Sequence, residues 1–136
     1  MLNKLFKIAA AVASVKDDSR LFRVGCSAIR SDNVIVSASN APVMLGYTGS
    51  FIRKSFPPAH AEIRCSRKIN KNSIVFVARI RKDNQQYAMA RPCHNCMGVL
   101  LSKSVNKIYY TIDHETYGII CVKNKHIVSE KINYFR

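Results

Sequence analysis

One run of residues, Ile74 to Ile80, constrains the fold of this chain more than any other feature. The run reads Ile-Val-Phe-Val-Ala-Arg-Ile and is almost continuously β-branched or aromatic. Strands that are buried on both faces have this composition, whereas half-exposed strands alternate apolar and polar residues. We therefore predict a central strand, and the rest of the chain has to supply the strands beside it and the helices that cover it.

The flanking segments supply both kinds of element. Apolar residues at helical spacing, or a proline at the first position, predict three helices, at Leu2–Val15, Ala59–Ile69 and Pro92–Ser102. Further β-rich runs predict strands at Val24–Arg30, Val34–Ser39, Ile108–Ile112 and Ile119–Lys123. Residues 81–90 are interpreted as a polar connection and residues 125–136 as a mixed tail that suits a short helix. The order predicts an α/β layered domain with a five-stranded sheet, and the length suits residues 1–136 as a single domain.

The charge of the chain indicates an anionic partner. Lys and Arg total 22 against 8 Asp and Glu, which gives a formal charge of +14. Such an excess attracts phosphates, so we expect a nucleotide or single-stranded nucleic acid as the partner; the alternative is a generically basic surface. No apolar stretch is long enough to cross a membrane, and Lys7 interrupts the stretch that most resembles a signal peptide, so no membrane partner is expected.

The cysteines indicate metal binding in a reducing compartment. The chain has five cysteines, an odd number without the regular spacing of a disulfide framework. A Cys-x-x-Cys pair beside a histidine is typical of a metal site, and thiols of this kind persist in a reducing environment. We therefore expect a cytoplasmic protein. Cys26 and Cys121 lie in strand-like runs and are predicted to be small core residues.

Two short motifs carry the chemistry. His60-Ala61-Glu62 begins one predicted helix, and Pro92-Cys93-His94-Asn95-Cys96 begins the next. Zinc accepts imidazole nitrogen and thiolate sulfur, and helix starts favour ionised thiols, so His60, Cys93 and Cys96 are the candidate ligands. Three protein ligands leave a position for water, whose pKa zinc lowers to about 7, and Glu62 could move the protons. The alternatives are a redox pair or a closed zinc site completed by Cys65 or another residue.

The two motifs together resemble the zinc-dependent cytidine and deoxycytidylate deaminase superfamily, in which His-x-Glu is followed by Pro-Cys-x-x-Cys. The resemblance extends from the first helix to about Lys123. It implies a three-layer α/β/α fold, a Zn²⁺ cofactor held by His60, Cys93 and Cys96, and proton transfer by Glu62. It also implies assembly into a homo-oligomer.

The resemblance extends to candidate substrate contacts. Asn40 stands where the superfamily places an asparagine that binds the sugar hydroxyl, although asparagine is also common in turns. Ala61 would lend its backbone amide to the base. A long irregular loop precedes the first motif and interleaves aromatic and cationic residues, which suits a base stacked beside a phosphate. The substrate-binding candidates in that loop are Tyr47, Phe51, Arg53 and Lys54.

The substrate class stays open at this point. Met97-Gly98 follows Cys96, where free-cytidine deaminases usually carry Arg-Gln, and this favours the deoxycytidylate and tRNA-adenosine branches. The short segment between Ile112 and Ile119 instead suits an antiparallel pair of last strands, as in the free-cytidine branch. We expect deamination of cytosine in a deoxycytidylate-type nucleotide. The alternatives are a polynucleotide deaminase acting on single-stranded DNA or RNA cytosine or on tRNA adenosine, and a non-catalytic zinc module that binds nucleic acid.

Overall fold

The computed structural model describes residues 2–14, 23–40 and 60–136. Its helices are α1 (Leu2–Ala13), α3 (Ala61–Ser66) and α4 (His94–Ser102). Its strands are β1 (Arg23–Ile29), β2 (Ile35–Ser39), β3 (Ile74–Ile80), β4 (Tyr87–Ala88), β5 (Lys107–Thr111), β6 (Thr116–Lys123) and β7 (His126–Tyr134). The predicted succession of helices and strands is confirmed, and β4 and β7 are added to it.

The strands form one mixed sheet. Their order is β2-β1-β3-β5-β6-β7, and β4 pairs with β3 outside that path. β3 and β5 are parallel, and the other pairs are antiparallel. A parallel pair requires a crossover connection, which here contains β4 and α4. The antiparallel pairing expected for the last two predicted strands is found between β5 and β6.

The sheet has seven strands, so the prediction of five was wrong. The tail expected to suit a helix forms β7, because the chain reverses directly after β6. Asn124 and Lys125 have φ angles of 53° and 64°, as the two central residues of a tight hairpin turn do. The other unpredicted strand, β4, follows a turn in which the Gln85 N–H donates to the carbonyl of Arg81. That turn returns Tyr87 to pair with Ile80.

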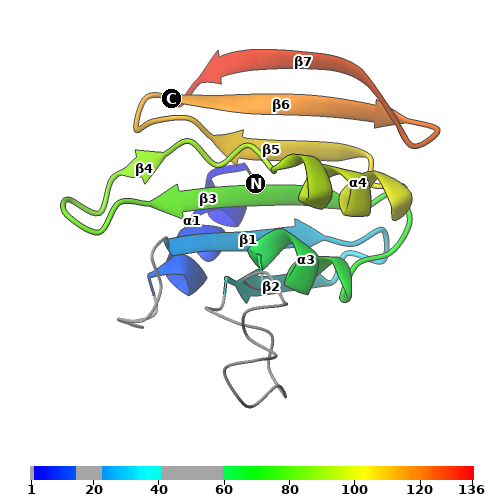
Figure 1. Cartoon of the computed structure of the whole chain (residues 1–136), viewed down its shortest axis with the longest axis horizontal. Coiled ribbons are helices and arrows are strands. Elements are labelled where there is room, and N and C mark those ends of the chain that lie inside the picture. The colour runs from blue at the N-terminus through cyan, green and yellow to red at the C-terminus, as the bar shows by residue number, and fades with distance from the viewer. Residues whose placement is uncertain (1, 15–22, 41–59) are drawn as a thin grey trace, which may run out of the picture.

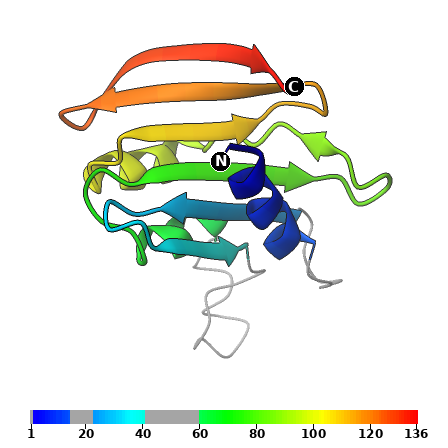
Figure 2. The ribbon, with the colours of Figure 1, turned by 180° about the vertical axis from the view of Figure 1, so that it is seen from behind.

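Helices cover both faces of the sheet, as the three-layer prediction required. Figure 1 shows α3 and α4 in front of the strands, and Figure 2 shows α1 against the opposite face. β3 lies between the two layers and is buried on both sides. Val75 and Val77 belong to the core cluster beneath α3 and α4, whereas Phe76 and Ala78 belong to the cluster beneath α1. The prediction of a central strand is therefore confirmed.

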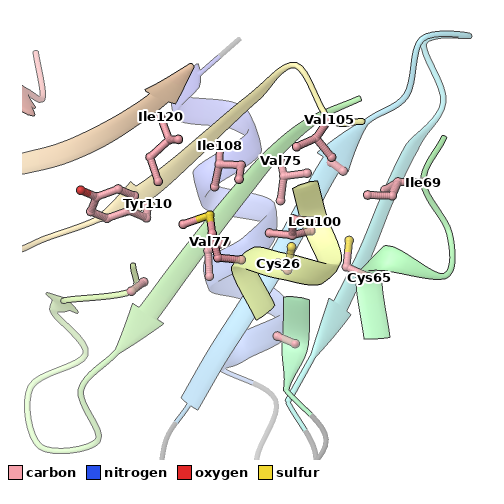
Figure 3. Packing of buried hydrophobic residues seen from close by; sticks show 14 of the residues in the cluster. Cys26, Cys65, Ile69, Val75, Val77, Leu100, Val105, Ile108, Tyr110 and Ile120 are labelled. Atoms are coloured by element: carbon pink, nitrogen blue, oxygen red, sulfur yellow. The ribbon is translucent and has the colours of Figure 1, made fainter. Parts of the chain in front are cut away.

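The larger core cluster fixes the two helices that carry the motifs. Leu100 of α4 and Cys65 of α3 point from the helices toward the strands (Figure 3) and are fully buried there. Cys26 of β1 belongs to the same cluster, as predicted. Burial of such side chains contributes on the order of 1.5–3 kcal/mol each for the aliphatic ones. Apolar packing on the sheet therefore holds α3 and α4 beside each other.

α1 contacts the backbone of β1 directly at Gly25. A Cβ atom at this position would lie 1.8 Å from the carbonyl oxygen of Ala9 and 2.9 Å from the nitrogen of Ala13. Only glycine allows the helix to approach the strand this closely. In the described ranges, none of the helices has the length and apolarity needed to cross a membrane.

β7 stands at one end of the strand order and carries exposed apolar side chains. Ile132 and Tyr134 are 66% and 72% exposed. The pairing of β7 with β6 is interrupted by a register shift between Cys121 and Val122, which marks a bulge or a similar irregularity. β7 is therefore less regular than the strands that pair along their whole length.

Candidate metal centre and substrate pocket

The starts of two helices meet beside the sheet. His60 is the N-cap residue of α3 and Cys93 is that of α4, and both have extended backbones, with φ and ψ of −73° and 147° at His60 and −67° and 169° at Cys93. Their carbonyl groups accept the first helical hydrogen bonds, from the N–H groups of Arg64 and Met97. Neither side chain forms a capping hydrogen bond to its own helix. The imidazole and the thiol instead point toward each other.

The three predicted ligands form a compact group. Nδ1 of His60 lies 3.1 Å from Sγ of Cys96 and 3.7 Å from Sγ of Cys93. All three ligand atoms lie within 4.8 Å of one another. Zinc–sulfur bonds of about 2.3 Å and zinc–nitrogen bonds of about 2.0 Å at a tetrahedral centre place N and S about 3.5 Å apart. The spacing and the soft donor set of one imidazole and two thiols therefore fit Zn²⁺.

In the described part of the chain, three protein ligands form the group and no fourth joins them. Among the residues that the structure describes, only His60, Cys93 and Cys96 form such a cluster of potential metal ligands. Cys65, the candidate fourth ligand of a closed site, is fully buried in the core and is hydrogen bonded to Cys26. Structural zinc sites use four protein ligands, whereas catalytic sites use three and keep the fourth position open. The described residues thus resemble the catalytic arrangement.

Glu62 lies beside the metal group without belonging to it. Its side chain is 6% exposed and is hydrogen bonded to the side chain of Cys96. Burial raises the pKa of Glu62 above its ordinary value, while its hydrogen bonds and the charge of His60 act in the opposite direction. Among the residues that the structure describes, no ion pair includes Glu62, and His60 is the cation whose charge acts on its carboxyl group.

The Cys96 thiol differs from the expectation based on its helix start. Burial, followed by the charge of Glu62, raises the pKa of Cys96. The expected effect of the helix start is in the other direction, but it acts here on a sulfur atom that is fully buried. A coordinated metal removes the thiol proton outright. A bound metal, rather than the helix start, would therefore ionise Cys96.

A pocket of about 270 Å³ opens beside this group. Its walls combine apolar side chains with a few polar ones, as small-molecule sites do. Three of the predicted chemical residues, His60, Glu62 and Cys93, line it together with Ala61 and Asn40. The full lining is Val24, Asn40, His60, Ala61, Glu62, Arg79, Met89, Ala90, Arg91 and Cys93.

Asn40 lines the pocket and is held there by hydrogen bonds to the backbone of β1. Its Oδ1 atom accepts a hydrogen bond of 3.0 Å from the N–H of Val24, and its own N–H donates to the Val24 carbonyl at 3.0 Å. These bonds continue the pairing of β1 and β2 beyond the last residue of β2. The side-chain carbonyl of Asn40 is thus already hydrogen bonded to the backbone of β1. The observation that still supports sugar binding by Asn40 is its position in the pocket wall.

The prediction that an aromatic and basic loop binds the substrate is not tested by the structure. Tyr47, Phe51, Arg53 and Lys54 lie outside the described residues. Two basic residues that follow the first motif, Arg64 and Lys68, bind backbone carbonyl groups of β2. Arg64 donates to the carbonyl of Ser39 at 2.7 Å, and Lys68 donates to the carbonyl of Ser37 at 2.6 Å. Both side chains therefore fasten α3 and the turn after it to β2.

The cations that do line the pocket, Arg79 and Arg91, were not predicted. Arg79 is near the end of β3 on the same side of the strand as Val75 and Val77. Arg91 stands two residues before Cys93 and is held by a carboxylate of β7. The place of Arg91 directly before the Pro-Cys motif is a local signal that could have drawn attention to it. No comparable signal in the sequence distinguishes Arg79 from other cations.

Comparison with known proteins adds one positive finding. Residues 1–112 match the family described as the cytidine and deoxycytidylate deaminase zinc-binding region. The match includes both motifs and every pocket residue named above. It ends before β6 and β7. No curated protein matches the chain.

Proposed function

The chain belongs to the cytidine and deoxycytidylate deaminase zinc-binding family, and we propose that it deaminates a cytosine base in a phosphate-bearing substrate, with a deoxycytidylate-type nucleotide favoured. The observation that carries the proposal is the meeting of His60, Cys93 and Cys96 at a pocket whose wall also contains the buried carboxyl group of Glu62. Family membership supports hydrolytic deamination, and the arginines in the pocket wall support the phosphate.

The proposed reaction assigns separate tasks to the ligands and to Glu62. His60, Cys93 and Cys96 would hold the zinc ion, which would supply an activated water as the nucleophile. Glu62 would pass one proton of the attacking water to the ring nitrogen and then pass the second to the departing amine. The new bond joins the water oxygen to the ring carbon that carries the amine, and the carbon–nitrogen bond breaks. Cytosine and water thereby give uracil and ammonia.

The pocket walls suit a pyrimidine nucleotide. Val24, Met89 and Ala90 offer apolar contact to the base, and Ala61, which also lines the pocket, would donate its backbone N–H to the base. The lining also contains Arg79 and Arg91, whose charges would attract the phosphate.

A polynucleotide substrate is the second candidate, and the overall charge favours it. A single phosphate requires one or two cations, whereas the formal charge is +14. A second hollow, of about 490 Å³, is lined by three lysines, Lys71, Lys123 and Lys125, at the end of the sheet where β3 and β5 begin. Cations spread over the surface in this way suit the backbone of a longer strand.

The decisive variant is Glu62→Gln, with Glu115→Gln as its control. Glu115 is an exposed glutamate in the turn between β5 and β6, so its replacement tests only the loss of a charge. Glu62→Gln should retain zinc and lose ammonia release by about 10²- to 10⁴-fold, the usual contribution of a general acid–base residue. Zinc content and ammonia release are measured on the same samples. Full activity of Glu62→Gln would contradict the proposed role of Glu62. If the unaltered chain binds zinc and nucleic acid but releases no ammonia, the non-catalytic zinc module is favoured.

A substrate panel then separates the two enzymatic candidates. We expect the zinc-loaded chain to deaminate dCMP faster than cytidine, single-stranded DNA, single-stranded RNA or tRNA. A steep loss of strand deamination between low and moderate salt would support the polynucleotide candidate, because strand binding releases counterions. Activity confined to dCMP would exclude it.

The setting in which the chain works is part of the proposal. A reducing compartment such as the cytoplasm keeps the thiols of Cys93 and Cys96 free to bind metal. We also expect residues 1–136 to act as a single domain that assembles into a homo-oligomer. Light scattering during size-exclusion chromatography measures the mass of that assembly.

A further inference from the structure

Arg91 joins the pocket to a strand that lies beyond the family match. It lines the pocket beside the metal ligand Cys93, and only Pro92, whose side chain is fully buried, separates the two residues. Nε and Nη2 of Arg91 donate to the two carboxylate oxygens of Glu130, at 2.8 Å and 3.0 Å. Glu130 is in β7, and the family match ends at residue 112.

The sheet is built so that Glu130 can reach this position. Glu130 pairs with Ile120 of β6, and both side chains are on the face covered by α3 and α4. The Tyr110 hydroxyl, from β5, donates to Glu130 across β6. Tyr110 can cross β6 because the residue opposite it is Gly118, where a Cβ would lie 2.1 Å from Cζ of the tyrosine ring.

Burial and the Glu130 carboxylate raise the pKa of Tyr110 to about 12, so its hydroxyl remains a donor. The hydrogen bonds from Arg91 lower the pKa of Glu130, so its carboxylate remains charged. Glu130 therefore stays ionised and Tyr110 stays protonated across the neutral range.

The hydrogen bonds among Arg91, Glu130 and Tyr110 contribute little to the stability of the fold, and their main effect is to orient the guanidinium group of Arg91. The Arg91 and Glu130 side chains are 44% and 31% exposed, and water screens ion pairs of this kind. The bidentate pair uses one edge of the guanidinium group, formed by Nε and Nη2. Nη1 takes no part in these two hydrogen bonds to Glu130. A guanidinium group has five N–H donors, and its second edge matches two oxygens of a phosphate.

We propose that Arg91 is the specificity-determining residue that binds the 5′-phosphate of the target nucleotide through its second edge, and that Glu130 and Tyr110 are positioning residues that hold this edge toward the pocket. The inference rests on the proposed deaminase function and adds a substrate contact to it. It makes β7 a working part of the substrate site. A mononucleotide and a nucleotide within a strand both carry this phosphate.

The test compares substrates with and without the phosphate. The variants are Arg91→Gln, Arg91→Lys and Glu130→Gln. Matched controls are Arg81→Gln and Asp83→Asn, because Arg81 forms the same type of bidentate pair with Asp83, at 3.2 Å and 3.1 Å, in an exposed turn outside the pocket. For each protein, kcat/KM is measured for dCMP, for deoxycytidine and for a short single-stranded oligonucleotide with one cytosine.

Arg91→Gln should lower the ratio of kcat/KM for dCMP to that for deoxycytidine by about 10- to 100-fold, the effect of losing hydrogen bonds to a charged group. Most of this loss should be in KM, since the phosphate is remote from the reacting amine. Arg91→Lys should restore part of the ratio, and Glu130→Gln should give a smaller loss of the same kind. The controls should leave the ratio unchanged. Equal losses for both substrates, or an unchanged ratio in Arg91→Gln, would overturn the inference.

A measurement of product binding tests the role of Arg91 without requiring catalytic turnover. Titration calorimetry compares dUMP with deoxyuridine, and Arg91→Gln should remove the preference for dUMP. If the unaltered chain releases no ammonia, the proposed function fails, and this binding experiment decides the inference by itself. Equal affinity of the unaltered chain for dUMP and deoxyuridine would overturn it. A loss of oligonucleotide activity in Arg91→Gln, with dCMP unaffected, would assign the contact to a strand and overturn it for the mononucleotide.

Discussion

Replacement of Gly25 by alanine tests the contact between α1 and β1. The added Cβ would be 1.8 Å from the Ala9 carbonyl oxygen, and ordinary contact begins at 3.4 Å, so α1 has to retreat by about 1.6 Å. The obstructing atoms belong to the helix backbone and cannot rotate away. Retreat also loosens the packing of Leu5 and Phe6, which are fully buried. Overpacking typically costs about 1–3 kcal/mol, and we expect the upper end here because no side chain can yield.

The expected loss is large relative to the stability of a domain. Natural domains unfold with a free energy of about 5–15 kcal/mol, so a loss of about 3 kcal/mol removes a substantial fraction. For a chain of 136 residues the corresponding fall in Tm is about 10 °C. Urea unfolding followed by circular dichroism measures the free energy, and thermal unfolding gives the shift in Tm.

Gly98→Ala is the matched control, with an effect of opposite sign. Gly98 is exposed within α4, and a Cβ there meets nothing within 4 Å. Alanine should therefore stabilise the helix by about 0.5–1 kcal/mol. Gly25→Ala with unaltered stability, or a destabilisation of similar size in both variants, would refute the reasoning from close approach.

Two further predictions concern the metal and the pH. Cys93→Ser and Cys96→Ser should lose bound zinc, whereas Cys121→Ser should keep it, as measured by elemental analysis after gel filtration; full zinc content in either ligand variant contradicts the assignment. The pKa of Tyr110, about 12, is above the ordinary value of about 10, so its contribution to stability is complete below pH 10 and declines as the pH rises toward about 12. An alkaline titration of tyrosinate absorbance should show a late phase that shrinks in Tyr110→Phe, and a single phase near pH 10 would contradict it.

The parts of the fold that depend on local sequence were predictable. β3 has the predicted bounds, Ile74 to Ile80, because burial on both faces leaves a continuous apolar run. The metal group was predictable because Cys93 and Cys96 share one helix start, and because His60 begins the helix before the same strand. Short-range spacing and the crossover around one strand were sufficient to bring these residues together.

The parts that depend on long-range contacts were not predictable. The hairpin turn at Asn124-Lys125 lacks the glycine that usually signals it, so β7 was not recognised. The chain has 22 Lys and Arg, and the sequence does not tell which of them enter a pocket. Arg91 is oriented by Glu130, which is 39 residues away and is placed by the registers of β5, β6 and β7. Only the assembled sheet brings such a pair together.

The exposed edge formed by β7 has a practical consequence for handling the protein. An edge strand with unpaired backbone groups and apolar side chains such as Ile132 and Tyr134 can pair with another copy. Mutual repulsion between chains of charge +14 opposes this encounter at low ionic strength. Salt shortens the range of that repulsion to about 10 Å at 0.1 M and leaves the apolar attraction in place. High-salt washes that strip nucleic acid from a basic protein therefore favour aggregation of this one through β7, and a moderate ionic strength is the better compromise for purification.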